Sequence, residues 1–264
     1  MNATKAFKIA TIMTSEEYRA AVHSHIMSRF GFFDEGQHWE SREVMLVDLG
    51  AGSGVSGAHV LSDLRRRLGG RASLVCVEPY PDLIDHEAMR RACPTGPDDA
   101  AATHMCLDAA AFAAGPTKAY THILLNQMAH HLVPNHIGIF KGIYKQIAPR
   151  GRMLIVTRPV EIDFPWFERL RSIWRRTQPP VKEFEDAARL AGFQNITTTQ
   201  HDLPFSVHKR DVYGWIRSRA WSEFSMLSEE EMDLGMAELE DRYKDVETLT
   251  FTDRLLLLSG DREN

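Results

Sequence analysis

The chain has 264 residues, of which 44% are hydrophobic and 25% charged, and its net charge is -5. This is an ordinary globular composition, and an acidic chain has no general attraction to nucleic acid or to an anionic membrane. Cys76, Cys93 and Cys106 have no metal-ligand spacing, and neither a signal-peptide core nor a bilayer-spanning apolar run is visible. We therefore expect a cytoplasmic protein with small-molecule partners, and the oligomeric state stays open.

Helical and strand-like segments alternate along the first 160 residues. Residues 14–30 begin with a capping box and have apolar side chains at helical spacing until Gly31. Apolar runs of strand length follow, and helical segments separate most of them, the clearest spanning about 55–68. These runs end at Leu49, Glu78, Asp108, near Gln127 and at Arg158. Such alternation predicts a parallel sheet covered on both faces, which is a doubly wound α/β fold.

The pattern changes after Pro159. A segment rich in aromatic residues and arginine precedes a helix that ends at Gly192, and a strand is expected over 193–203. Helical sequence with a serine–glutamate capping box then covers about 211–243, before a last strand in TLTFTDRLLLLSG. We expect this insertion to form a lid over the carboxyl edge of the sheet, where ligands bind in open α/β folds.

The glycine turn after the first strand, in VDLGAGSGVSG, fits two motifs. Gly52, Gly54 and Gly57 match the dinucleotide fingerprint G-x-G-x-x-G, whereas Asp48 starts a D-x-G-x-G-x-G motif that includes Gly50. Asp48 would repel the pyrophosphate of a dinucleotide, but it favours a ligand with a protonated amine and a sulfonium, such as S-adenosylmethionine. We therefore favour the motif that starts at Asp48 and expect Gly57 to serve helix packing.

Two more carboxylates follow the next two strands. Glu78 can hold ribose hydroxyls in either kind of cofactor, so it does not discriminate between them. Asp108 can accept a hydrogen bond from an adenine amino group, with the small Ala109 beside it. Each carboxylate alone is more often a helix cap or a turn residue. Together with the glycine turn, the three indicate one cofactor crevice.

The motifs VDLGAGSG, VCVEPY, MCLDAAAF, AYTHILLNQMAHHL and APRGRMLIVTRP occur in this order over about residues 18–159. In this order and spacing the chain resembles the class I S-adenosylmethionine-dependent methyltransferases. The resemblance implies a seven-stranded sheet with an antiparallel last strand. It implies one domain over 1–264, with a helical cover (1–40), a cofactor-binding core (41–160) and a substrate-side elaboration (161–264) whose lid spans about 205–245.

The resemblance also implies which residues hold the cofactor. The glycines would line its methionine portion, Asp48 its amine, Glu78 its ribose and Asp108 its adenine. Tyr18, on the leading helix, would cover its carboxylate. The full predicted set is Tyr18, Asp48, Gly50, Ala51, Gly52, Gly54, Glu78, Pro79, Asp108, Ala109, Leu125 and Asn126.

The methyl acceptor is expected near the loop that follows the fourth strand, which faces the methyl group in the resembled family. His130 and His131 lie there and could act as a base or orient the acceptor, although both could instead be structural. We predict acceptor contacts from His131, Arg158, Trp166 and Trp215. The alternatives are a surface ion pair for Arg158 and core packing for the tryptophans. No metal site is expected, because the histidines lack a paired metal-binding arrangement.

The expected function is methyl transfer to an oxygen or nitrogen atom of a small molecule. An acceptor that bears a carboxylate is one form of this expectation. Nucleic-acid methylation is disfavoured, because Asn126 is followed by Gln-Met-Ala rather than Pro-Pro-Tyr. Two alternatives are kept. One is an NAD(P)-dependent oxidoreductase that uses the motif from Gly52, and the other is a cofactor-binding partner subunit without catalysis.

Overall fold

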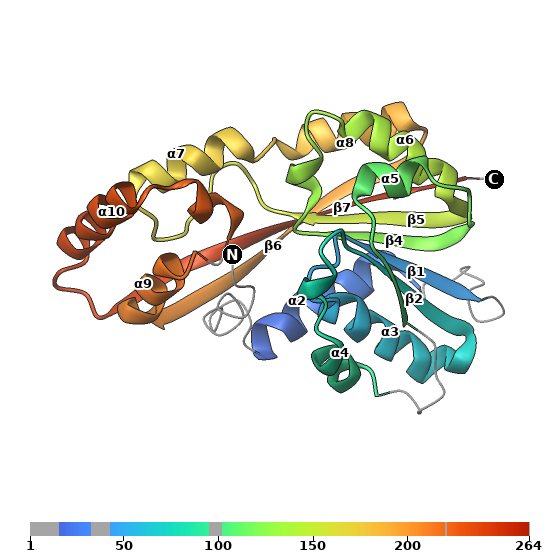
Figure 1. Cartoon of the computed structure of the whole chain (residues 1–264), viewed down its shortest axis with the longest axis horizontal. Helices are drawn as coiled ribbons and strands as arrows, with labels where there is room; N and C mark the ends of the chain where they lie inside the picture. Colours follow the sequence, from blue (N-terminus) through green and yellow to red (C-terminus); the bar gives the residue numbers. More distant parts are fainter. Residues whose placement is uncertain (1–15, 33–42, 95–101, 220, 264) are drawn as a thin grey trace. The chain divides into compact units, whose positions relative to one another are not determined.

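The computed structural model describes residues 16–32, 43–94, 102–219 and 221–263. In these residues seven strands form one sheet in the order β3-β2-β1-β4-β5-β7-β6 (Figure 1). β1 is parallel to β2 and β4, β2 to β3 and β4 to β5, whereas β7 is antiparallel to β5. The predicted seven-stranded, mostly parallel fold is therefore confirmed. The strands are β1 Val44–Leu49, β2 Ala72–Val77, β3 Ala102–Met105, β4 Tyr120–Asn126, β5 Ile147–Thr157, β6 Gln194–His208 and β7 Thr248–Asp261.

Helices cover both faces of the sheet. α5, α6 and α8 lie on one face, and α3 and α4 lie on the other (Figure 1). α3 buries Val60, Leu61, Leu64 and Leu68, which recur at helical spacing, so its apolar side packs on the strands. The described α-helices are α2 Glu16–Phe30, α3 Val55–Leu68, α4 His86–Ala92, α5 Ala109–Ala114, α6 His136–Gln146, α7 Glu168–Thr177, α8 Val181–Ala191, α9 Lys209–Arg217 and α10 Glu229–Arg242.

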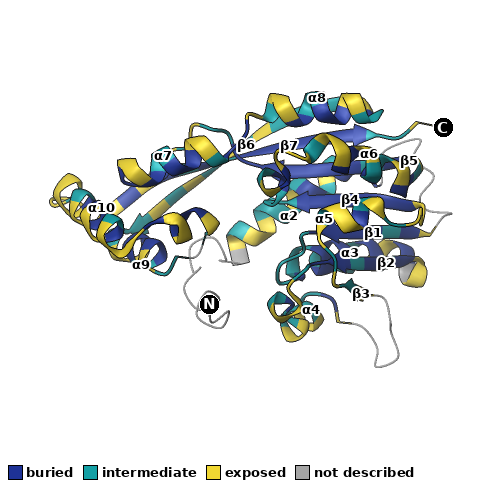
Figure 2. Cartoon of the chain, turned by 45° about the horizontal axis from the view of Figure 1, so that its top comes forward, coloured by how far each residue is buried: buried dark blue, intermediate teal, exposed yellow. Residues whose placement is uncertain are grey.

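The chain divides into two compact units. Of the described residues, unit 1 comprises 16–22, 158–180, 200–219 and 221–255, and unit 2 comprises 23–32, 43–94, 102–157, 181–199 and 256–263. In unit 2 the core is formed by strands with buried apolar side chains and by the helices packed on them, as the dark residues of β1, β4 and β5 show (Figure 2). In unit 1 the core is rich in aromatic rings. The predicted single domain with its cover, core and elaboration stays a prediction.

Several element ends follow the sequence signals closely. β1 ends at Leu49 and α3 spans 55–68, both as predicted, α2 ends before Gly31 at φ 60°, and α8 ends before Gly192 at φ 110°. These two glycines adopt the left-handed conformation that commonly stops a helix. The predicted capping box at residues 14–17 includes residues that lie outside the described part of the chain.

Two strand ends differ from the prediction. β6 continues past Pro204 to His208, because it lies at the edge of the sheet, where a residue without an N–H is tolerated. β3 ends at Met105 rather than at Asp108, because Asp108 caps the N-terminus of α5.

The predicted helical insertion is present as α9, the 3-10 turn η5 (Ser222–Met226) and α10. The capping box is confirmed, since Ser228 Oγ accepts from the Glu231 N–H and the Glu231 side chain accepts from the Ser228 N–H. The placement of the insertion as a lid stays a prediction. No helix among the described residues has the length and apolar character needed to cross a membrane.

Candidate active site

The turn between β1 and α3 contains three glycines in the left-handed region. Gly50, Gly52 and Gly54 have φ angles of 72°, 53° and 75°, which L side chains rarely adopt. A Cβ added to Gly50 would lie 2.8 Å from Met128 Cγ, and one added to Gly54 would lie 2.5 Å from Met89 Sδ. At Gly52 no described atom lies within 4 Å of the added Cβ. The space in which a side chain of the middle glycine would lie is therefore open.

Gly57 has a different role in the first turn of α3. Its added Cβ would lie 2.8 Å from Asp48 Oδ2 and 3.0 Å from Leu74 Cδ1, so the missing side chain lets the helix approach the sheet. The predicted helix-packing role is confirmed. The third glycine of the dinucleotide fingerprint also serves close packing of helix and strand, so the packing role of Gly57 does not decide between the two motifs. Gly50 does favour the motif from Asp48, because it is left-handed and lies outside that fingerprint.

Asp48 lies beneath the turn, with only 1% of its surface exposed. Its Oδ2 accepts a hydrogen bond of 3.0 Å from the Gly57 N–H, and its buried Oδ1 has no donor among the described residues. Burial raises the pKa of Asp48 to about 7; the Gly57 hydrogen bond opposes this shift, and the charge of Glu78 adds to it. The carboxyl therefore titrates near neutrality.

Glu78 ties the glycine turn to the end of β2. Its Oε2 accepts from the Gly52 N–H at 3.0 Å, and its Oε1 accepts from the Tyr80 N–H at 3.2 Å. Pro79, between them, is half-buried, whereas Tyr80 is exposed. The open glycine and the second predicted carboxylate are thus in direct contact.

Asp108 is exposed and caps α5, since its Oδ1 accepts from the Ala111 N–H at 2.7 Å. The helix-cap interpretation of this residue is confirmed. Ala109 is the first residue of α5 and is half-buried. The adenine contact of both residues stays a prediction, and a cap of this kind leaves the second carboxylate oxygen for another donor.

The end of β4 also reaches the first turn of α3. Leu125 is fully buried, and the next residue, Asn126, donates from Nδ2 to Ser56 Oγ at 3.0 Å. Asn126 Oδ1 is buried without a donor among the described residues. Gln127 then adopts a left-handed φ of 58°, and its N–H donates to the Val156 carbonyl. A non-glycine residue in this region is uncommon, and such strain gathers at functional sites.

His130 and His131 follow in the 3-10 turn η4 (Ala129–Leu132). Their ring centroids are 3.9 Å apart, and His130 is half-buried whereas His131 is exposed. The His131 N–H donates to the carbonyl of Met128, the residue that covers Gly50. The histidine pair therefore starts directly beside the glycine turn. Its role in catalysis stays a prediction.

The remaining predicted residues belong to unit 1, where Arg158 is buried with Asp253 and Tyr18. Arg158 Nε donates to Asp253 Oδ1 at 2.7 Å, and its Nη2 donates to Asp253 Oδ2 at 2.9 Å and to the Tyr18 hydroxyl at 3.1 Å. The Tyr18 hydroxyl donates to Asp253 Oδ2 at 2.8 Å. Arg158 therefore makes an ion pair, as the alternative prediction held, but inside the protein rather than on its surface.

Charge and burial act in opposite directions within this group. Burial alone would lower the pKa of Arg158, but Asp253 and the Tyr18 hydroxyl outweigh it and raise the pKa. Burial is the main cause that raises the pKa of Tyr18, to which Asp253 adds and which Arg158 opposes. The Arg158 guanidinium also lies 4.6 Å from the ring centroid of Trp221. The guanidinium, carboxylate and phenol thus form one hydrogen-bonded group that packs against the Trp221 ring.

Trp166 and Trp215 are fully buried in the aromatic core of unit 1. Their ring centroids are 6.1 Å apart, and Trp221 contacts both edge-on, at 5.3 and 5.0 Å. Neither indole Nε1 has an acceptor among the described residues. The two side chains pack as core residues, and their contact with an acceptor molecule stays a prediction.

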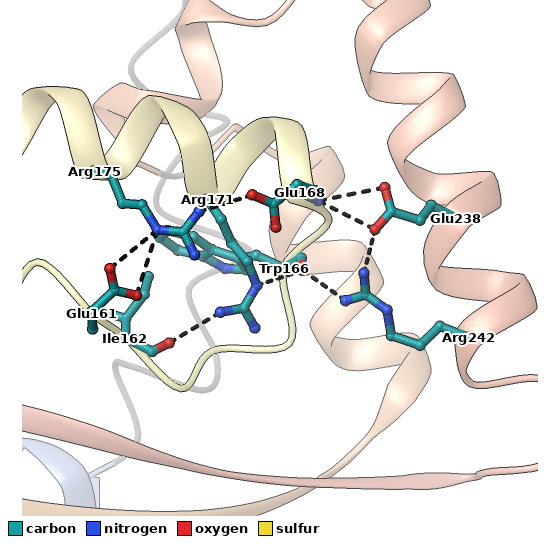
Figure 3. A network of polar contacts seen from close by, with 8 residues as sticks. All are labelled: Glu161, Ile162, Trp166, Glu168, Arg171, Arg175, Glu238 and Arg242. Carbon is teal, nitrogen blue, oxygen red and sulfur yellow. Dashed lines mark hydrogen bonds and ion pairs between the residues drawn. The ribbon is translucent and has the colours of Figure 1, made fainter.

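Arginines hold the backbone that carries Trp166 (Figure 3). Arg171 donates from Nε to the Trp166 carbonyl and from Nη1 to the Ile162 carbonyl, and Arg242 donates to the Trp166 carbonyl at 2.9 Å. Arg242 also pairs with Glu238, whose carboxylate accepts from the Glu168 N–H and so joins α10 to α7. These contacts therefore hold the backbone of Trp166 in place beside the aromatic core.

Sequence reasoning missed Asp253, Ser56, Met89 and Met128. Asp253 had a signal, because it is an isolated carboxylate inside the apolar pattern TLTFTDRLLLL and therefore a candidate for a buried ion pair. The two methionines had none, since their positions depend on how α4 and the end of β4 approach the turn. In the described ranges no group of His, Cys, Asp and Glu side chains could hold a metal ion.

The chain is similar in structure to several solved proteins. A Haemonchus contortus phosphoethanolamine N-methyltransferase, solved with phosphomonomethylethanolamine and S-adenosylhomocysteine, superposes with a TM-score of 0.61 at 16% identity, over 100% of this chain and 58% of that one. A protein of Anabaena variabilis, assigned to methyl transfer in an antibiotic biosynthesis pathway, gives 0.60 at 14%, covering 91% and 96%. The cyclase SpnF gives 0.52 at 13%, covering 92% and 81%.

These similarities establish the fold, which is that of class I S-adenosylmethionine-dependent methyltransferases. The chain spans 58% of the length of the Haemonchus protein, and the cyclase shows that the fold also supports other reactions. A scan of protein-family models and a search of curated proteins found no match.

Proposed function

We propose that the protein is an S-adenosylmethionine-dependent methyltransferase that acts on an oxygen or nitrogen atom of a small molecule. The observation that carries this proposal is the contact between the Gly52 N–H and the Glu78 carboxylate, at 3.0 Å in a turn whose middle glycine faces open space. The shared fold supports the same cofactor, since the Haemonchus structure contains S-adenosylhomocysteine.

This contact argues against a dinucleotide. A phosphate-binding turn offers its free N–H groups to the pyrophosphate. Here the Gly52 N–H already donates to a carboxylate, and the carboxyl of Asp48 lies below the same turn. The carboxyl of Asp48 disfavours a diphosphate and favours a ligand with positive charge, whereas Glu78 suits the ribose of either cofactor. S-adenosylmethionine has an ammonium and a sulfonium, and its ribose hydroxyls could replace the Gly52 N–H as donors to Glu78.

The roles of the remaining residues are part of the proposal. Gly50, Ala51, Gly52 and Gly54 would line the methionine portion, Pro79, Asp108 and Ala109 the nucleoside, and Leu125 and Asn126 the end of β4 beside the reacting methyl. Tyr18 is a further proposed cofactor contact, and Arg158, Trp166 and Trp215 would serve the acceptor side. An acceptor that bears a carboxylate is the finer form of the proposal.

The bound cofactor would supply an electrophilic methyl group, and the protein would align the acceptor with it and exclude water. An acceptor that loses a proton needs a base, and His130 and His131 are the proposed groups. The exposed His131 could pass that proton to solvent.

Calorimetric titration with S-adenosylmethionine, S-adenosylhomocysteine and NADH tests the proposal. We expect binding of the first two and none of NADH. Gly52→Ala would place a methyl group in the open space of the turn and weaken binding by about 10-fold or more, since the left-handed backbone is strained as well. Gly138→Ala, where the added Cβ meets no described atom within 4 Å, is the matched control and should bind normally. Binding of NADH alone would overturn the proposal.

A further inference from the structure

Two buried acceptor groups lie on the same face of the sheet, beneath the first turn of α3. Asp48 pairs with Leu124 across β1 and β4, and Asn126 is two residues farther along β4, so both side chains point to the same face. They contact consecutive residues of α3. Asp48 accepts from the Gly57 N–H, and Asn126 donates to Ser56 Oγ. The carboxyl and the amide are therefore neighbours.

Each of these groups has one buried oxygen without a donor among the described residues, Asp48 Oδ1 and Asn126 Oδ1. Buried acceptors usually have a donor, and an ionised carboxylate without a countercharge is costly to bury. A proton on Asp48 reduces both costs, because it removes the charge and adds an O–H donor in a place where two buried oxygens lack one.

The acidic group that faces Asp48 from β2 also favours this proton. α3 contributes the Gly57 N–H, β4 contributes Leu124, and β2 contributes the Cys76 thiol and, at its end, the Glu78 carboxylate. The charged group that acts on Asp48 is thus another acid. Burial raises the pKa of Asp48 to about 7, well above the value of an exposed aspartate, although the Gly57 hydrogen bond opposes the shift.

We propose that Asp48 links cofactor capture to the release of a proton: the free protein holds a proton on Asp48, and a ligand ammonium that binds at the glycine turn drives this proton into solvent. The inference rests on the proposed function, because it takes the ammonium from the cofactor. No covalent bond forms or breaks other than the O–H of Asp48. The ammonium keeps its own protons, and its positive charge stabilises the carboxylate that remains.

The linkage makes affinity depend on pH and on the amine. Below neutral pH the ligand must expel a proton, so binding weakens as the pH falls. With a pKa of about 7 for Asp48, an ammonium ligand should bind about 15-fold more weakly at pH 5.5 than at pH 7, where α-amino groups are still mostly protonated. A ligand with the same nucleoside but without the amine should show no such loss.

Calorimetry in two buffers of different ionisation enthalpy measures the proton count directly. The probes are S-adenosylhomocysteine, which has the ammonium but no sulfonium, and methylthioadenosine, which has neither. We expect the first to release close to one proton at pH 5.5 and about half a proton at pH 7, and the second to release none. Binding of S-adenosylhomocysteine without proton release at pH 5.5, or equal release by both probes, would overturn the linkage while leaving the proposed function intact.

The Asp48→Asn variant tests the proton without any ligand. A group whose folded pKa lies above its unfolded value contributes stability at low pH and loses it as the pH rises to the folded pKa. The melting temperature of wild type should therefore fall relative to Asp48→Asn between pH 4 and pH 7 and then level off. The exposed Asp186→Asn is the matched substitution and should not reproduce this change. Parallel curves for wild type and Asp48→Asn would show that Asp48 holds no extra proton and would overturn the inference.

The two experiments separate failure of the inference from failure of the proposed function. If neither S-adenosyl ligand binds at any pH, the proposed function fails and the linkage fails with it, even where the stability curves place a proton on Asp48. If S-adenosylhomocysteine binds, only the proton count decides whether the linkage holds.

Discussion

The glycine turn of unit 2 and the group of Arg158, Asp253 and Tyr18 in the core of unit 1 differ in how their buried polar atoms are satisfied. In the core, the fork of Arg158 meets both oxygens of Asp253, and the Tyr18 hydroxyl bonds to both partners. At the turn, the buried oxygens Asp48 Oδ1 and Asn126 Oδ1 have no donor in the described part of the chain. A polar group that is fully satisfied favours a structural role, whereas unpaired acceptors beside an open backbone favour a ligand. The comparison therefore favours a structural role for the Arg158 group and ligand binding at the glycine turn.

The largest effect is expected in the aromatic core. Asp253→Asn keeps the shape of the side chain but leaves Arg158 as a buried charge without its countercharge, which typically costs about 3 to 5 kcal/mol. Urea unfolding of the variant and of wild type measures this loss. A loss of less than about 1 kcal/mol in the free energy of unfolding would mean that the ion pair does not stabilise the core. It would also weaken the contrast between the Arg158 group and the glycine turn.

A smaller effect is expected where α3 packs on the sheet. Gly57→Ala would push a methyl group against Asp48 Oδ2 and Leu74, and overpacking of this kind costs about 1 to 3 kcal/mol. Gly138→Ala carries the same change on α6 with no described atom in the way, so it should be neutral or add up to about 1 kcal/mol. The difference between the two variants in urea unfolding measures the contact. Equal stability would mean that α3 can move away from Asp48 freely.

The buried His122 should make unit 2 sensitive to acid. It packs against the rings of Phe30 and Phe32, and burial, with a contribution from Arg152, lowers its pKa well below the usual value. Below about pH 6.5 the unfolded chain takes up a proton on this histidine that the folded chain does not. The free energy of unfolding therefore decreases as the pH is lowered, by up to about 1.4 kcal/mol per pH unit. This is opposite in sign to the effect of Asp48. Unfolding of His122→Gln at pH 7 and pH 5.5 should show a smaller loss than wild type; an equal loss would assign the acid sensitivity to other groups.

The smallest effect concerns the start of α10. Ser228→Ala removes the oxygen that accepts from the Glu231 N–H, and a lost N-cap costs about 1 kcal/mol. Ser228→Asn should keep most of the cap and most of the stability. Thermal unfolding of both variants gives the comparison. Equal melting temperatures would show that the capping box contributes little to unit 1.

The sheet could be predicted from local patterns, but the contacts of the site could not. The bounds of β1 follow from a run that is apolar except for Asp48, and those of α3 follow from its helical periodicity between glycines. The capping of α5 by Asp108 was also within reach, since an aspartate before three alanines is a common helix start. Local patterns therefore predict the cap by Asp108, but they do not predict its contact with an adenine.

Long-range contacts explain the rest. Arg158 and Asp253 are 95 residues apart in the chain, and they meet because β7 pairs with β5 in one antiparallel register. Nothing in either local sequence specifies that register. The depth of Asp48 was easier to foresee, because Asp48 is flanked by Val47 and Leu49 in a strand that is covered on both faces.

The most direct test of the account follows a labelled methyl group. The purified protein is incubated with S-adenosylmethionine labelled on its methyl group and with a mixture of small metabolites, and the products are separated by mass. The account predicts label in one or a few small molecules together with formation of S-adenosylhomocysteine, and loss of both with the Gly52→Ala variant but not with Gly138→Ala. A protein that binds the cofactor but transfers no label to any small molecule would contradict the proposed enzyme activity.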